Sequence, residues 1–106
     1  MKNDCIAVFV TCSSRKEADV IIQALLKKRL AACGSIGGAV ESRFWWKGKV
    51  DKASEVLVIL KTKRAYFKKL ERKVRRLHSY EIPEIIALPI VAGSAAYLDW
   101  IRDTVV

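Results

Sequence analysis

Seven consecutive residues hold the densest group of ionisable and metal-ligating side chains in the sequence. The segment 78–84 reads His-Ser-Tyr-Glu-Ile-Pro-Glu and contains the only histidine of the 106 residues. An imidazole can ligate a metal or move a proton near neutral pH. One histidine cannot close a metal site, because tetrahedral sites need about four ligands. Its partners would therefore be Glu81, Glu84, a cysteine or groups from another subunit.

The types of ligand narrow the choice of metal. Imidazole, carboxylate and thiolate together suit copper or zinc better than magnesium or calcium, because softer donors favour the later transition metals. The simpler alternative is that His78 caps the C-terminal end of a helix, where the helix dipole favours a cation. The residues of the segment alone leave both interpretations open.

Aromatic residues indicate a second candidate site. Trp45 and Trp46 are adjacent, so in a strand their side chains lie on opposite faces, one toward the core and one outward. Tryptophan is enriched at subunit interfaces, but Trp46 and Tyr80 would equally line a ligand cleft. We expect Glu55 and Lys61 to border such a cleft. The alternative is that Glu55 and Glu84 are junction residues that pair with Lys61 or with the basic second helix.

The motifs of several enzyme classes are absent from the sequence. It has no phosphate-binding G-x-x-x-x-G-K-[ST] loop, no G-x-S-x-G turn and no H-E-x-x-H pair. Ser42 or Ser79 would need a base oriented by a third group to act as a nucleophile, and His78 is the only imidazole. We therefore expect a binding protein and not an enzyme.

The hydrophobic pattern predicts the elements that position these groups. Apolar, β-branched runs predict strands, and apolar residues at intervals of three and four predict helices. Ser14 and Glu17 have the spacing of a capping box at the start of the first helix. The predicted elements are a strand at 4–12, a helix at 14–31, strands at 39–46 and 55–62 joined by a turn at 47–49, a helix at 64–78, a strand at 85–90 and a last helix after Gly93.

This order of elements predicts an α+β fold of the ferredoxin-like type, βαββαβ with an added C-terminal helix. With 52% hydrophobic residues, we expect residues 1–106 to form a single domain. Both main helices would cover one sheet face, and the other face has few polar positions near Val8, Val56 and Val58, so we expect another subunit to cover it. RNA-recognition domains share this order, but their third strand carries base-stacking aromatic residues, which the run 56–60 lacks.

The net charge of +9 is concentrated in the second predicted helix and the residues before it. Such a run attracts phosphate polymers, anionic metabolites or acidic membrane surfaces, or it serves only as a solvated helix face that keeps the protein soluble. We expect any contact with nucleic acid to be non-specific. One acid, Glu71, stands among the basic residues Lys63, Arg64, Lys68, Lys69, Arg72, Lys73, Arg75 and Arg76.

The cysteines and the apolar runs indicate a cytoplasmic protein. Three cysteines, Cys5, Cys12 and Cys33, are an odd number without C-x-x-C spacing, which argues against a disulfide framework. Cys5 and Cys12 would lie roughly 23 Å apart on opposite faces of one strand, and we expect Cys33 to be a small buried residue. The apolar run near the N-terminus is unlike a signal peptide, and no run approaches the ~20 residues of a membrane span.

Several motifs in the same order and spacing together resemble the CutA divalent-cation tolerance family. The resemblance extends from Val8 to Ile101. It implies a homotrimer of ferredoxin-like protomers similar to the PII signalling proteins, linked to tolerance of copper and other divalent ions, with no established catalytic activity. The motifs are Leu-Ala-Ala-Cys at 30–33, Phe-Trp-Trp-Lys-Gly-Lys at 44–49, the run from Glu55 to Thr62, His-x-Tyr-Glu-Ile-Pro-Glu-Ile at 78–85 and Tyr-Leu-Asp-Trp-Ile at 97–101.

The resemblance implies a divalent metal, above all Cu²⁺, with His78 and Glu84 as ligands. The thiol of the family's first strand is not carried over to Cys12, because Cys12 is judged to be displaced from that position. The family's usual proline after the histidine is Ser79 here, which predicts a looser exit from the second helix. Gly34 and Ser35 replace a usual valine–asparagine pair. The alternative is a PII-like sensor that binds a small anionic metabolite in inter-subunit clefts, a function that the net positive charge favours.

Overall fold

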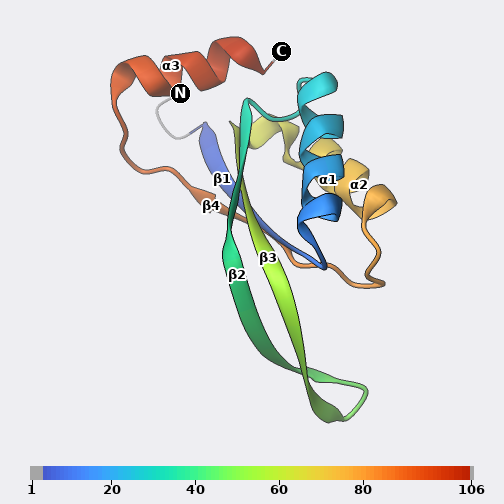
Figure 1. Ribbon diagram of the computed structural model, residues 1–106. Coiled ribbons are helices and arrows are strands. Elements are labelled where there is room, and N and C mark those ends of the chain that lie inside the picture. Colours follow the sequence, from blue (N-terminus) through green and yellow to red (C-terminus); the bar gives the residue numbers. More distant parts are fainter. Residues whose placement is uncertain (1–3, 106) are drawn as a thin grey trace.

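The computed structural model describes residues 4–105 as a four-stranded sheet with helices on one face and at one end (Figure 1). The strands lie in the order β2-β3-β1-β4, and every neighbouring pair is antiparallel. The predicted order of strands and helices is confirmed. The elements are β1 (Cys5–Cys12), α1 (Arg15–Lys27), β2 (Cys33–Trp46), β3 (Lys49–Lys63), a 3-10 turn (Arg64–Tyr66), α2 (Phe67–Leu77), β4 (Ile85–Pro89) and α3 (Ala95–Thr104).

The main core lies between the sheet and the two helices α1 and α2, which cover the same sheet face (Figure 1). Both helices bury one stripe at helical spacing, and the strands contribute alternate residues. Burying each large aliphatic side chain contributes about 1.5–3 kcal/mol. The fully buried residues of this main core include Val8, Val10, Ala18, Ile21, Leu25, Val58, Leu60, Leu70 and Val74.

Helix α1 ends at Lys27, four residues before the predicted end at 31. The amide of Leu30 donates to the Leu25 carbonyl at 2.9 Å, and the amide of Arg29 donates to the Leu26 carbonyl at 3.0 Å. These two bonds form a Schellman motif, which needs a left-handed residue that is usually glycine. Arg29 takes that place with φ of 55°, so the sequence lacks the usual stop signal.

Strands β2 and β3 are both longer than the predicted 39–46 and 55–62. The glycines at 37 and 38, predicted to lie outside the strand, instead mark a register shift within β2 between Ile36 and Ala39. The predicted turn is confirmed as a two-residue hairpin in which Lys47 and Gly48 have φ of 50° and 81°. The resulting hairpin projects well beyond the rest of the sheet (Figure 1).

The second helix and the last strand differ from their predicted bounds by a few residues. The predicted 64–78 is a 3-10 turn followed by α2, and His78 is the residue that caps α2, its amide donating to the Val74 carbonyl at 2.9 Å. The predicted 85–90 is β4, which ends at Pro89. β4 is an edge strand, and an edge tolerates Pro89 because the missing amide donor is not needed there.

Helix α3 closes a smaller core at the end of the sheet. Its Ile101 is fully buried with Cys5, Ala32 and Val105. Arg102 also donates to the Asp4 carboxylate at 2.9 Å. α3 is therefore attached to the start of β1 by both apolar and polar contacts.

The sheet face away from α1 and α2 is apolar and partly uncovered. The residues facing the core alternate with those facing away, and Phe9 pairs with both Ile59 of β3 and Ile86 of β4 on this second face. Ile86 is 50% exposed, and Leu88, two residues later on the same face, is also exposed. The expected apolar second face is therefore present.

We predict that Gly34→Ala destabilises the fold by about 1–3 kcal/mol, the usual cost of overpacking a core. A Cβ at position 34 would lie 2.8 Å from two side-chain carbons of Ile22 and 3.0 Å from Leu60. Gly38→Ala is the matched control, since a Cβ there meets nothing within 4 Å. Urea unfolding of both variants measures the difference, and equal stabilities would contradict the packing argument.

Candidate metal centre

The ring of His78 is buried at the junction between α2 and β4 and bonded on both sides. Its Nε2 lies 2.7 Å from the Thr11 carbonyl oxygen, and its Nδ1 accepts the Tyr80 amide at 3.1 Å. Since Nδ1 accepts, Nε2 carries the proton and donates to Thr11. His78 is thus the cap residue of α2, as one interpretation expected, but its ring bonds to the end of β1 and not to the helix carbonyls.

Glu17, in the first turn of α1, lies beside this ring. Its Oε1 accepts the amide and hydroxyl of Ser13 at 2.8 and 2.9 Å, and its Oε2 accepts the amide of Ser79 at 2.8 Å. The Ser14 hydroxyl accepts the Glu17 amide, so the predicted capping box forms, with Ser13 in place of Ser14 as the donor to the carboxylate. Although burial alone would raise the pKa of Glu17, the hydrogen bonds from Ser13 and Ser79 lower it to about 2.

Ser79 ties the exit of α2 to α1. A proline at this position, as the family usually has, carries no amide hydrogen and could not donate to Glu17. The looser exit expected from the loss of proline is therefore offset by a hydrogen bond that only a non-proline residue can make.

Cys12, at the end of β1, completes a cluster that the sequence did not reveal. One ligand atom each of Cys12, Glu17 and His78 lies within 4.8 Å of the others. Sulfur, imidazole nitrogen and carboxylate oxygen form a donor set that fits copper or zinc. Burial, followed by the charges of Glu17 and Glu55, raises the pKa of the Cys12 thiol to about 12, so this thiol must lose a proton to bind a metal.

A groove of about 820 Å³ adjoins this cluster, between the β2–β3 hairpin and the segment after His78. It brings together Trp46, Glu55 and Tyr80, three of the four residues expected to border a cleft, and Glu84 lies on its wall. Burial and a hydrogen bond to the Glu55 carboxylate raise the pKa of the Tyr80 hydroxyl to about 12. The centre of the Tyr80 ring also lies 4.7 Å from that of the His78 ring, with the two ring planes tilted by 52°.

The groove is acidic in a protein that is otherwise strongly basic. Four carboxylates line it against two cations, so its local field favours cations. The Glu84 side chain is exposed there, whereas His78 lies behind Tyr80 and is not part of the wall. The carboxylates are those of Asp51, Glu55, Glu81 and Glu84, and the cations are Arg43 and Lys52.

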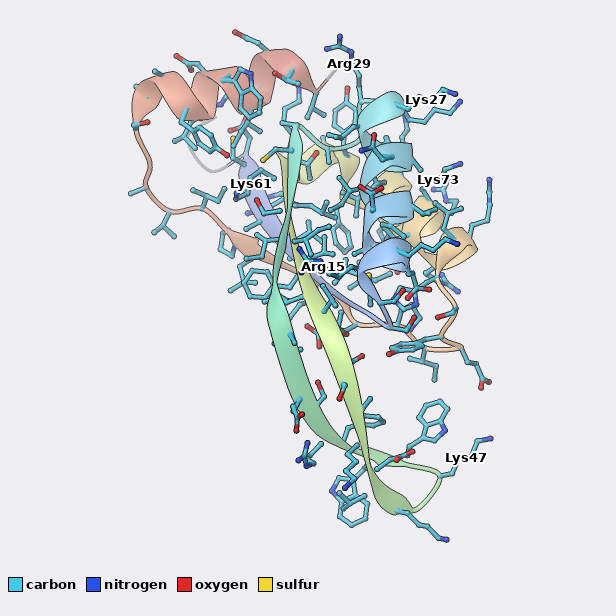
Figure 2. The ribbon with its side chains drawn as sticks, in the orientation of Figure 1. Arg15, Lys27, Arg29, Lys47, Lys61 and Lys73 are labelled. Carbon is cyan, nitrogen blue, oxygen red and sulfur yellow. The ribbon has the colours of Figure 1, made fainter. Side chains whose placement is uncertain are left out.

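Lys61, the fourth expected cleft residue, lies elsewhere in the protomer. It is at the end of β3 far from the hairpin tip that carries Lys47 (Figure 2). Its Nζ lies 4.0 Å from the Cys33 sulfur and 6.0 Å from the centre of the Tyr97 ring. Cys33 itself is partly exposed, so the expectation that it is buried is wrong. The reason is that Cys33 begins an edge strand and is covered on one side only.

The two tryptophans differ in burial, as their adjacent positions predicted. Trp46 is half-buried in the groove wall, with the Lys47 ammonium 5.9 Å from its ring centre. Trp45 is 75% exposed and pairs across the hairpin with Val50, which is also exposed. The end of the hairpin therefore presents an uncovered apolar surface.

The sequence as a whole is similar to a known protein family. The model of the CutA1 divalent ion tolerance protein family matches residues 6–104. The chain belongs to the CutA1 family. This confirms the resemblance inferred from the motifs. In the described part of the chain, no helix combines the length and the apolar character needed to cross a membrane.

Individual CutA proteins are similar over most of this chain. The divalent-cation tolerance protein CutA of Thermus thermophilus is 43% identical over 96 residues, which cover 91% of this chain and 93% of that protein. Protein CutA of Homo sapiens is 44% identical over 92% of this chain but only 54% of its own length, so the chain spans about half of that relative. The structure titled periplasmic divalent cation tolerance protein CutA, from Archaeoglobus fulgidus, aligns with a TM-score of 0.93 at 40% identity, covering 96% of this chain and 99% of that one.

We expect Glu17→Gln to cost about 1.5–3 kcal/mol of unfolding free energy at neutral pH, the range for hydrogen bonds to a charged group. Because the folded-state pKa is lowered, this contribution is present above about pH 4.5 and is lost as the pH falls toward about 2. Unfolding of the metal-free protein at several pH values measures it. The advantage of the wild type over Glu17→Gln should shrink across that window. Asp19→Asn, an exposed substitution on the same helix, is the control, and an advantage independent of pH would contradict the assignment.

Proposed function

We propose that this CutA1 family member is a homotrimeric, non-catalytic protein that binds a divalent metal, with copper as the physiological ion. The observation that carries the proposal is the proximity of Cys12, Glu17 and His78 beside an acidic groove. The relatives named for divalent-cation tolerance support the class of ligand. His78 and Glu84 are the ligands expected from the sequence, and Cys12 and Glu17 join them in the proposal.

Each of the three clustered ligands has a hydrogen bond or a proton to give up. His78 Nδ1 accepts the Tyr80 amide, Glu17 accepts three hydrogen bonds, and Cys12 holds its proton. A metal that takes His78 Nδ1 displaces the Tyr80 amide and so shifts the segment that carries Glu84. Metal binding would then release a proton and alter the junction between α2 and β4.

The acidic groove supports a cation as the ligand in preference to an anionic metabolite. Glu81 and Glu84 attract a cation to the segment beside His78, while Lys61, the cation expected to bind an anion there, lies at the other end of β3. The net charge of the chain does not decide the ligand, because the field inside the groove is set by its own carboxylates.

The apolar sheet face and the hairpin support assembly into a trimer. A chain of this size buries only about two-thirds of its unfolded surface, so association is a natural source of further burial. Ile86 and Leu88 on the sheet and Trp45 and Val50 on the hairpin are large apolar residues exposed in one protomer. We propose that these surfaces contact other copies of the chain.

We propose the cytoplasm as the location, although the Archaeoglobus relative is titled periplasmic. The three cysteines are free, and Cys12 is a proposed ligand that acts only in its reduced form. Cell fractionation tests the location.

Removing a ligand should weaken copper affinity by at least about tenfold, because removing even a residue that only hydrogen-bonds to a metal ligand typically has an effect of this size. We predict this for His78→Ala and for Cys12→Ser, and a smaller loss for the exposed Glu84→Gln. Titration of the wild type and variants with CuCl₂, followed by calorimetry and by the thiolate-to-copper absorption band, measures the affinity.

Glu41→Gln serves as the matched control, because Glu41 is an exposed carboxylate on β2 outside the groove lining. Circular dichroism checks that each variant folds. Copper affinity that is unchanged in both folded His78→Ala and Cys12→Ser would sink the proposed site.

Ile86→Glu should dissociate the trimer, because it places a charge on a surface that is buried on assembly. Light scattering coupled to size exclusion gives the mass. Val20→Glu is the control, since Val20 is also 50% exposed but lies on α1, on the helical side. A monomeric wild type, or equal dissociation by Val20→Glu, would overturn the assembly proposal.

A further inference from the structure

The outer face of α2 is a dense surface of cations, which we call the basic helical face. It consists of Lys68, Lys69, Arg72, Arg75 and Arg76, all exposed. Among residues 4–105, no salt bridge reaches any of them. These exposed charges are therefore largely unneutralised, apart from the Glu81 carboxylate beside three of them.

The cations of this face are regularly spaced. Lys68, Arg72 and Arg76 follow one another at intervals of four residues, which is about 6 Å along a helix axis. Arg72, Arg75 and Arg76 also line a hollow of about 390 Å³, together with Pro83 and one carboxylate, Glu81. The face thus presents a row of charges with a recess beside it.

This arrangement has a cost in the isolated protein. Like charges four residues apart destabilise a helix, and α2 has no acid in its first turn to offset them. Leu70 and Val74, both fully buried, hold the helix on the sheet in spite of this repulsion. A linear anion laid along the face would relieve it.

The neighbouring elements extend the same surface. Lys73 of α2 and Lys27 of α1 both point away from the sheet on the helical side of the molecule (Figure 2). This side is opposite the apolar sheet face that carries Ile86. Association through the sheet face would therefore leave the basic helical face open.

We propose that the basic helical face binds the phosphate backbone of nucleic acid without regard to sequence. The regularly spaced, exposed lysine and arginine side chains suit a phosphate polymer, because their binding to phosphates releases the counterions of the polymer. The ring of Tyr66, just before α2, has the ammonium groups of Lys63 and Lys69 at 5.2 and 5.8 Å from its centre, so this ring contacts cations and is not presented for stacking on bases.

An acidic membrane is a poorer partner for this face. Helices that lie in a membrane surface insert exposed apolar side chains beside their cations. The apolar stripe of α2 faces the core, with Leu70 and Val74 fully buried. Helix α2 therefore has charge for a polyanion, and none of its large apolar residues is exposed for insertion.

Fluorescence anisotropy with a labelled, mixed-sequence DNA strand of about 24 nucleotides, longer than one binding site, tests the proposal. Log affinity should fall linearly with log salt between about 50 and 200 mM, with a slope of about −0.7 for each phosphate neutralised on a single strand. In Arg72→Gln/Arg76→Gln the slope should shrink in magnitude by about 1.4 or more. Glutamine keeps the helix propensity, so the variant should fold.

The matched control is Lys47→Asn/Lys49→Gln, which removes the same net charge from the hairpin tip, far from α2 (Figure 2). It should leave the slope unchanged. Absence of DNA binding at about 50 mM salt, or an equal effect of the control variant, would overturn the proposal. Binding to phosphatidylserine vesicles without binding to DNA would overturn it as well and favour a membrane partner.

Discussion

The hydrogen-bonded junction around His78 is the constraint on which the site depends. One ring joins the carbonyl at the end of β1 to the amide of Tyr80, and one carboxylate, Glu17, joins the start of α1 to the amide of Ser79. Two segments distant in sequence, 11–17 and 78–80, therefore meet through two polar side chains. Because buried polar groups are costly when unpaired, each bond holds the others in place. The segment that carries Glu84 is positioned as a consequence.

The imidazole of His78 and the carboxylate of Glu17, which hold the junction together, are also two of the proposed metal ligands. Under the proposed function, a metal would compete with these hydrogen-bond partners for the ligand atoms. Metal binding would then change the conformation at the exit of α2, close to the acidic groove wall. The amide of Ser79 contributes to this junction by donating to the Glu17 carboxylate. A proline there would leave the Glu17 carboxylate one donor short and so freer to turn toward a metal.

The sequence predicted the order of the elements, because apolar periodicity reports directly on which face of a helix or strand is buried. It also located the segment around His78 by the concentration of polar groups. It could not predict that Cys12 and Glu17 would meet His78, since that contact depends on how the end of β1 packs against the exit of α2. Only the capping-box spacing hinted at Glu17. The sequence also did not predict that α1 ends early at Lys27. The left-handed residue that ends the helix is Arg29, whereas glycine is the residue that normally marks such an end.

Nitrogen NMR of the imidazole tests the central claim most directly, because the sequence contains a single histidine and so gives a single ring system. In metal-free protein, we predict a protonated Nε2 and an unprotonated Nδ1. Addition of Zn²⁺, a diamagnetic stand-in for copper, should shift the Nδ1 resonance strongly and change the Tyr80 amide signal with it. An imidazole spectrum that stays unchanged while the protein is saturated with zinc would contradict the account.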